Sequence, residues 1–220
     1  MSVYEKMTAL ANILRSKTGL TEPLGIDDMI AAAANIPSLD NLIDGTCTEI
    51  TSQAESIKSY MFYEFTNLIT ANFPLATNVG TYAFYYSSNL TTVTLPEATT
   101  IGSYAFSGCS NLKSIKLPHV SKINSMTFAS CSNLKTVDLG ICNSIGNYAF
   151  STCPRLTAVV LRSSSVCTLT YTNAFTNCYH ILGTTNNTYN PNGLKDGYFY
   201  VPRSLINSYK SASNWATYSS

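Results

Sequence analysis

The chain has 220 residues, of which 45% are hydrophobic and only 11% are charged, and its formal net charge is +1. The hydrophobic fraction supports a buried core and argues against disorder, whereas the charged fraction lies well below the roughly 25% usual for soluble domains. No Lys/Arg run offers the basic stripe of a nucleic-acid-binding protein, and no stretch of about 18 apolar residues could span a membrane. Solubility therefore depends on Ser, Thr, Asn and Tyr, which suits an extracellular or virion surface.

Residues 1–36 are predicted to form a small helical hairpin. Ser2 and Glu5 have the spacing of a capping box, in which each side chain satisfies a backbone N–H group at the helix start. An apolar stripe at helical spacing follows, formed by Met7, Leu10, Ile13 and Leu14. Gly19 ends this helix, and a second short helix is expected over 26–36. Such a hairpin has too little core to fold alone, so it either caps the following unit or serves for docking or oligomerisation.

The first residues do not have the pattern of a secretory signal peptide. Glu5, Lys6 and Arg15 interrupt the region where an unbroken apolar run would be needed. We therefore expect that the general secretory route does not export the chain. Residues 37–44 are predicted to be a linker.

A repeat begins after this linker. An Asn-Leu pair recurs every 22 residues from Asn67 to Asn133, and Arg155 with Leu156 takes the same place one unit later. The first half of each unit follows the pattern Leu-x-x-Val/Ile-x-Leu, whose alternation predicts a short strand with one buried face. Pro96 and Pro118 end such strands, because proline cannot donate to a continuing ladder.

The second half of each unit has the pattern Val/Ile-Gly-x-Tyr-Ala-Phe-x-x-Cys. We expect its glycine to permit a turn that other residues would resist, and the Tyr-Ala-Phe stretch to form a helical turn. The aromatic residues that this turn would point inward are Phe84, Phe106, Phe128 and Phe150.

One unit cannot bury both of its halves, but stacked units can, with like residues forming ladders along a shared core. The predicted fold class is therefore α+β, a solenoid of 22-residue coils with short strands over 45–182, preceded by the helical hairpin. The chain has seven cysteines, an odd number, and no C-x-x-C pair. Cys109, Cys131 and Cys153 are best explained as one ladder of buried thiols, with a redox or metal-binding role as the less favoured alternative.

The last segment, 183–220, is predicted to be a loop followed by a cap made of a strand and a helix. Residues 183–193 are rich in Asn, Thr and Gly, which is typical of a loop. The stretch from Tyr198 to Pro202 repeats the strand-then-proline half of the unit, and Ser204 can begin a final helix. Trp215 is expected to seal the end of the core.

The units from Asn67 to Cys178 resemble the BspA-like leucine-rich repeats, the Treponema pallidum type. The unit from Asn89 to Cys109 matches that pattern almost in full, whereas Gly140 and Arg162 replace the strand-ending proline in later units. The resemblance implies a leucine-rich-repeat solenoid, in a family whose members are mostly surface proteins that adhere to host proteins or cells. It implies no catalytic residues.

Two shorter resemblances concern the ends of the chain. Residues 7–19, with 26–29 after them, are similar to a helical leader of phage tail-associated proteins from gut bacteria. Residues 201–215 are similar to the end of repeat proteins from the same sources. The first resemblance implies virion docking or self-association through residues 1–36.

Outward strand positions form the first candidate ligand face. They are Thr92 and Thr94, Ser114 and Lys116, Thr136 and Asp138, then Ala158 and Val160. Solenoids often bind through such a face, and the alternative is plain solvated surface.

Tyrosines near the first coils form a second candidate site, namely Tyr63, Tyr85 and Tyr86. Tyrosine offers contact area and a hydroxyl group at low entropic cost, which suits the recognition of protein or carbohydrate. The alternative is packing at the edge of the array. The loop over 183–193 is a further candidate.

No paired carboxylates, nucleophile-base set or phosphate loop is evident, so neither catalysis nor a cofactor or metal is expected. Asp27 and Asp28 suit a helix start, and His119 and His180 have structural explanations. The main hypothesis is a phage or prophage tail-associated protein of the virion that contacts the bacterial surface. The alternative is a bacterial cell-surface adhesin that binds host protein or glycan.

Overall fold

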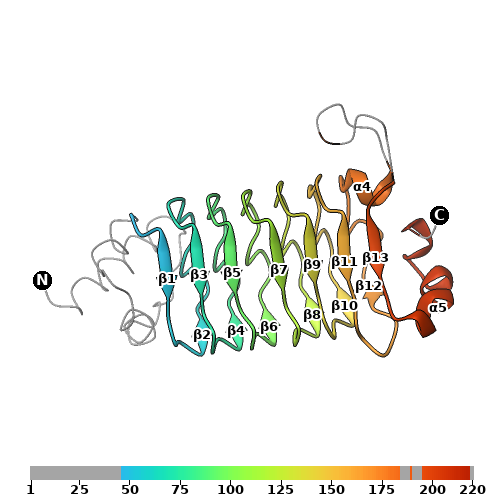
Figure 1. Cartoon of the computed structure of the whole chain (residues 1–220), viewed down its shortest axis with the longest axis horizontal. Helices are drawn as coiled ribbons and strands as arrows, with labels where there is room; N and C mark the ends of the chain where they lie inside the picture. The colour runs from blue at the N-terminus through green and yellow to red at the C-terminus, as the bar shows by residue number, and fades with distance from the viewer. Residues whose placement is uncertain (1–45, 184–188, 190–194, 219–220) are drawn as a thin grey trace, which may run out of the picture.

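A computed structural model describes residues 46–183, 189 and 195–218 of the chain (Figure 1). These residues form a solenoid in which most coils contribute one three-residue and one two-residue strand. The longer strands are β1 (Glu49–Thr51), β3 (Thr70–Asn72), β5 (Thr92–Thr94), β7 (Ser114–Lys116), β9 (Thr136–Asp138), β11 (Ala158–Val160) and β13 (Tyr198–Tyr200). The shorter ones are β2 (Ser56–Ile57), β4 (Asn78–Val79), β6 (Thr100–Ile101), β8 (Lys122–Ile123), β10 (Ser144–Ile145) and β12 (Thr168–Leu169).

Helices in this part of the chain are few, short and near the C-terminus. They are α4 (Tyr179–Leu182), η1 (Arg203–Leu205), α5 (Ile206–Ser211) and η2 (Ala216–Tyr218). The described residues thus form a β-solenoid, and the α+β class was too helical for them. The predicted hairpin over 1–36 and the linker over 37–44 lie outside the described residues, as does most of the 183–193 loop.

All strand pairs are parallel, because every coil runs in the same direction. Residues one repeat apart are direct neighbours: Thr70 pairs with Thr92, and Ser114 pairs with Thr136. The second strand of each coil was missing from the sequence-based expectation. It forms a second set of ladders on the opposite side of the core (Figure 1).

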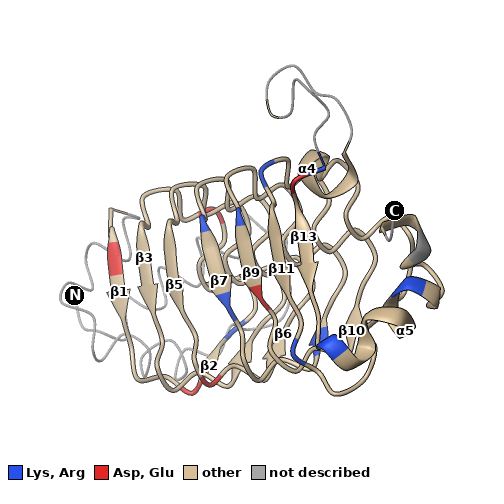
Figure 2. Ribbon diagram, turned by 45° about the vertical axis from the view of Figure 1, so that its right-hand side comes forward, with Lys and Arg blue, Asp and Glu red and all other residues tan. Residues whose placement is uncertain are grey.

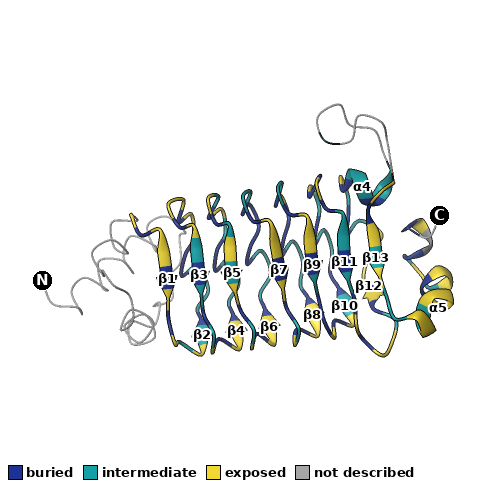
Figure 3. Ribbon diagram, viewed as in Figure 1, coloured by how far each residue is buried: buried dark blue, intermediate teal, exposed yellow. Residues whose placement is uncertain are grey.

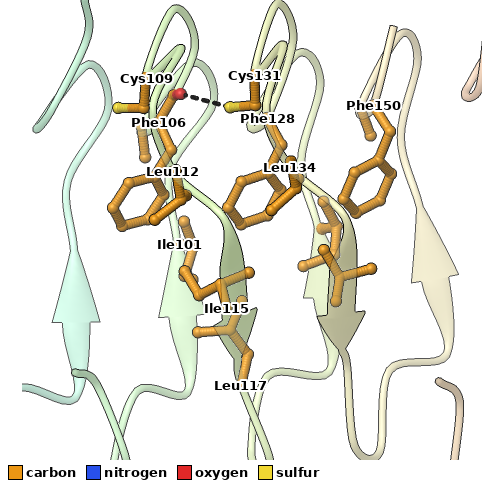
Figure 4. Packing of buried hydrophobic residues seen from close by; sticks show 14 of the residues in the cluster. Ile101, Phe106, Cys109, Leu112, Ile115, Leu117, Phe128, Cys131, Leu134 and Phe150 are labelled. Carbon is orange, nitrogen blue, oxygen red and sulfur yellow. Dashed lines mark hydrogen bonds between the residues drawn. The ribbon is translucent and has the colours of Figure 1, made fainter. Parts of the chain in front are cut away.

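The core is a set of ladders that run along the solenoid (Figure 4). The rings of Phe106 and Phe128 stack at a centroid distance of 5.4 Å, and those of Phe150 and Phe175 at 5.2 Å, both with an interplanar angle of 3°. Phe175 keeps this place although its unit carries an insertion. The prediction that these rings point inward is confirmed.

The cysteines form a parallel ladder of thiols. The Sγ atom of Cys131 donates to the carbonyl oxygen of Phe106 at 3.1 Å (Figure 4). Cys153 does the same to Phe128 at 3.1 Å. All seven cysteines of the chain are buried and unbridged. Burial raises the pKa of the Cys109 thiol, because an apolar surrounding disfavours the thiolate. The prediction of buried free thiols is confirmed.

The glycine and Tyr-Ala-Phe positions differ from expectation. The left-handed conformation belongs to the tyrosines, with φ of 58° at Tyr82 and 59° at Tyr104, so the segment is a series of turns and not a helical turn. Backbone bonds to the next coil hold it there, such as Phe84 N–H to Ala105 O at 2.7 Å. Gly102 serves close approach instead of a turn, since an added Cβ would lie 2.4 Å from the Thr81 backbone nitrogen.

The C-terminal segment closes the end of the core. Trp215 is 3% exposed, and its ring meets that of Phe199 edge-on at 4.9 Å. Tyr218 packs against Phe175 in the same manner, at 5.5 Å. The predicted sealing role of Trp215 is confirmed.

Candidate binding surfaces

The outward side chains of the longer strands stand in two rows along one face of the solenoid, which we call the sheet face. One row contains Glu49, Thr70, Thr92, Ser114, Thr136, Ala158 and Tyr198. The other contains Thr51, Asn72, Thr94, Lys116, Asp138, Val160 and Tyr200. Figure 3 shows exposed positions on β5, β7 and β9, with intermediate ones on β11. The structure therefore brings all the predicted strand residues onto one surface.

The sheet face carries little charge, as Figure 2 shows. Its best-defined polar contact joins Asp138 to Arg162, with Arg162 Nη2 2.7 Å from Asp138 Oδ2. Burial acts to raise the pKa of Asp138, but hydrogen bonds from Arg162 and from the Gly140 N–H outweigh it and hold this pKa below its ordinary value. Asp138 is therefore a carboxylate near pH 7, and its partner restrains it.

The ladders are interrupted between β5 and β7. These strands belong to different sheets, as do β6 and β8 on the other side of the core. Val93 on β5 is consequently half-buried, whereas Ile115 on β7 is 4% exposed. A depression of about 370 Å³ extends from this interruption over β7, β9 and β11, lined by Thr92, Ser114, Lys116, Thr136 and Asp138 among others. Seven of the eight predicted outward strand residues, Ala158 and Val160 included, thus line one hollow.

Asn124 provides a physical reason for the interruption. It stands in the regular unit at the place that Gly80, Gly102 and Gly146 take in the others. The N–H group of Gly102 donates to the coil before it at 2.8 Å, whereas at Asn124 the side-chain Nδ2 reaches the Ile101 carbonyl oxygen at 2.7 Å. We attribute the separation of the coils to Asn124 together with the path of the chain around it, because Thr170 also has a Cβ at the equivalent place and its coil still pairs with the one before.

Two exposed tyrosines end the sheet face, and the sequence-based candidates did not include them. Tyr198 is 57% exposed and Tyr200 is 53% exposed, next to Ala158 and Val160 in the rows. The signal was present in the sequence, because both residues flank the inward Phe199 in the strand-like part of the cap. They add an aromatic end to a face that is otherwise rich in hydroxyl groups.

The tyrosine candidates lie on the turn segments and belong to a larger cluster. The Tyr63 and Tyr85 rings stack at 5.1 Å, and Tyr85 contacts Tyr86 at 4.7 Å. Three further rings complete it: Tyr82 stacks on Tyr60 at 5.0 Å and on Tyr104 at 4.7 Å. Tyr60, Tyr82 and Tyr104 were missed as site residues, although their 22-residue spacing predicts that they are neighbours.

Stacking leaves mainly the edges and hydroxyl groups of these rings at the surface. Burial raises the pKa of Tyr63 and Tyr85, and the nearby Glu64 carboxylate adds to the effect on Tyr63. Both phenols are therefore neutral hydrogen-bond donors near pH 7. Tyr86 differs, because it is 49% exposed and lies against Gly108 of the next coil, where an added Cβ would be 2.8 Å from its ring.

Other chemistry in the described part of the chain is limited. Within residues 46–183 and 195–218, no three His, Cys, Asp or Glu side chains gather as metal ligands would. His180 Nδ1 lies 2.6 Å from Asp196 Oδ1 and ties α4 to the segment that leads into β13. The described residues include no helix that is long and apolar enough to cross a membrane.

Parallel in-register coils with an inner Leu and Phe ladder define a leucine-rich-repeat solenoid. A family model described as the BspA type leucine-rich repeat region matches the chain in 6 copies, over residues 41–141 and 77–202. This match covers more than half of the chain, and the chain therefore belongs to the BspA-type leucine-rich-repeat family.

Two other comparisons, with curated protein sequences and with solved structures, say less about the chain than the family match does. No curated protein sequence matches the chain. Among solved structures, the chain is similar to a leucine-rich cell surface protein from Faecalibacterium prausnitzii A2-165, with 21% identity and a TM-score of 0.44. The similarity covers 72% of this chain and 33% of the other, so the chain spans about a third of that protein's length.

Proposed function

We propose that the chain is a non-catalytic binding module of the bacterial cell surface, which holds a host protein or a glycan on its sheet face. The observation that carries the proposal is the hollow of about 370 Å³ on this face, surrounded by hydroxyl groups and the Lys116–Asp138 pair of neighbours. The exposed Tyr198 and Tyr200 extend the same face. Hydroxyl, charged and aromatic groups in one row suit an extended polar ligand.

Rigidity supports this assignment. Each outward side chain stands on a strand whose inward neighbour is packed in the core, as with Val137 between Thr136 and Asp138. Binding groups held in this way lose little conformational freedom when a ligand arrives, so less of the interaction energy is lost on ordering. The face is therefore suited to binding without rearrangement.

The chain belongs to the BspA-type family, and the resemblance of its repeats to that family implies an adhesive surface protein. This membership supports the cell-surface setting. The tail-associated hypothesis depends on residues 1–36, which lie outside the described residues, and the family match adds nothing to it. It stays a prediction. Detection of the protein by surface proteolysis of intact bacteria would favour the first setting, and detection in purified phage particles the second.

A pair of variants tests the sheet face. Thr92→Arg with Thr136→Arg places two long cations at the hollow, and Thr99→Arg with Asn143→Arg places the same charges at exposed positions beside β6 and β10. Labelled proteins are applied to an array of immobilised glycans and to epithelial cells with and without protease treatment. We expect the first variant to lose about tenfold or more in binding, and the second to bind like the unmodified chain. Equal binding by both variants would remove the sheet face from consideration.

A further inference from the structure

The two sheets end at the C-terminus in different ways. On the side of β12, cap side chains satisfy the backbone: the Cys167 N–H donates to Tyr209 Oη at 2.8 Å, and Trp215 Nε1 donates to the Cys167 carbonyl oxygen at 2.5 Å. Asn214 Nδ2 donates to the carbonyl oxygen of Leu169 at 2.8 Å. Side chains thus replace the next strand at this edge.

The edge of β13 is covered by described residues only at its start, where the Gly197 N–H donates to the His180 carbonyl oxygen at 3.1 Å. The Tyr198 N–H donates to Thr157 O at 2.8 Å, and the Tyr200 carbonyl oxygen accepts from Leu161 N–H at 2.8 Å, both on the side of β11. Because successive residues of a strand direct their backbone groups to alternate sides, the Phe199 N–H and C=O groups point away from β11. Among the described residues no strand pairs with this side of β13. It is an open edge.

A groove of about 530 Å³ runs beside this open edge, between β13 and the segments α5 and η2. Its apolar lining includes Phe199, Ile206, Trp215 and Tyr218. Its charged lining consists of Lys195 and Lys210, and no acidic side chain of the described residues lines it. The groove takes the place that the strand of a further coil would fill.

We propose that this groove binds an extended peptide segment, which adds a parallel strand to β13 and carries acidic residues beside an apolar one. The open N–H and C=O groups require a partner with peptide spacing, and the inward side chain of an added strand would enter the apolar groove. Lys210 and Lys195 favour carboxylates at its flanks through their positive charge, although Lys195 Nζ also donates to the Tyr218 carbonyl oxygen at 3.3 Å. Figure 1 shows α5 beyond β13 along the solenoid, where the end of a second solenoid would otherwise stack.

The added strand would lie about 4.8 Å from β13, the usual distance between neighbouring strands. Its outward side chains would then meet Tyr198 and Tyr200, and cross-strand pairs of aromatic with β-branched residues are favourable. The occupant is therefore a strand in which Thr and Val alternate, with Glu or Asp at each end.

Trp215 is the only tryptophan in the chain and lines the groove, so its fluorescence reports occupancy. The probe is an acetylated and amidated peptide, ETVTVTE, and its controls are KTVTVTK and ETVPVTE. The first control reverses the flanking charges, and the proline in the second prevents strand pairing. We expect a saturable change in Trp215 emission with ETVTVTE, binding weakened about tenfold with KTVTVTK, and none with ETVPVTE.

Two variants of the full chain complete the test. Val201→Pro removes an N–H group on the open side, and Ile206→Glu places a carboxylate in the groove; both should abolish the response to ETVTVTE. Hydrogen exchange of the Phe199 and Val201 amides in the unmodified chain provides a readout that does not depend on variant folding, and we expect peptide-induced protection there. The proposal is overturned if no protection appears at millimolar peptide, or if ETVPVTE binds as well as ETVTVTE. Equal binding of KTVTVTK would overturn the acidic character of the partner.

Discussion

The inward and outward sides of the same strands follow different rules. Along the core, one side chain recurs with little change, as in the Phe ladder, where consecutive rings are parallel within 20°. Along the sheet face, the equivalent outward place is occupied in turn by Thr92, Ser114, Thr136, Ala158 and Tyr198. In the core, dense packing fixes the volume and shape of each side chain. On the sheet face the side chains contact water, so residues of different size and chemistry fit there. The scaffold therefore depends on the repeated positions, and the outward positions are free to differ in their chemistry.

The largest expected effect comes from breaking a core ladder. Phe128→Ala removes a ring that is 0% exposed and stacked between Phe106 and Phe150. The free energy of unfolding should fall by about 3–5 kcal/mol, measured by urea denaturation. Thr136→Ala on the sheet face is the matched control and should change it by less than about 0.5 kcal/mol. Similar losses in both variants would contradict the distinction between the two sides.

A smaller loss is expected where backbones of adjacent coils touch. Gly102→Ala places a Cβ 2.4 Å from the Thr81 nitrogen, so the coils must separate locally. The free energy of unfolding should decrease by about 1–3 kcal/mol, the usual cost of overpacking. Ser103→Ala, one residue further along, is the control in the same urea experiment. An unchanged free energy of unfolding for Gly102→Ala would show that the coils accommodate the added Cβ without losing stability.

The reverse change sharpens the explanation of the hollow. Asn124→Gly removes the side chain that separates two coils, so β5 should pair with β7 and β6 with β8. Amide hydrogen exchange in residues 114–116 and 122–123 should slow by about tenfold, which corresponds to about 1.4 kcal/mol of local stability. Ligand binding on the sheet face should weaken as the hollow closes. Unchanged exchange would show that another feature separates these strands.

The smallest effect concerns the ion pair on the sheet face. The pKa of Asp138 is lower in the folded chain than the roughly 3.9 expected when unfolded, so its contribution is present above that value and is lost as pH falls through the folded pKa. Arg162 is 62% exposed, so water screens the pair and Asp138→Asn should cost at most about 1 kcal/mol at pH 7. Urea midpoints of the two proteins should converge once the pH falls below the folded pKa of Asp138. A difference that persists there would have a cause other than charge.

The sequence alone predicted the parts of the fold that repeat. The 22-residue spacing placed the Phe and Cys ladders and the outward strand residues correctly, because an in-register stack turns sequence spacing into contact. It missed the second strand of each coil, since two residues such as Asn78 and Val79 are too short to show alternation. It also misplaced the left-handed residues, because contacts between coils hold Tyr82 in a conformation that its local sequence does not favour.

The candidate binding surfaces were predictable only in part. The sequence named residues such as Thr92 and Thr136 but could not reveal the hollow between them, because it depends on how closely two coils approach. Even the place of Asn124 is not decisive by itself, since Thr170 takes the equivalent position after the insertion and still bonds to Ile145 at 3.0 Å. How closely two coils approach depends on the path of the backbone as well as on the side chain at this place. The path of the backbone is known only from the three-dimensional structure.

The buried thiols have a practical consequence. From Cys47 to Cys178, the seven cysteines are distributed along the array, and none is accessible while its coil is closed. An alkylating reagent can therefore modify a given cysteine only when that part of the solenoid opens, and mass spectrometry can identify which one reacted first. The seven cysteines therefore act as probes of local unfolding at successive places along the array. The order in which they react would reveal whether the solenoid unfolds from one terminus or opens in the middle.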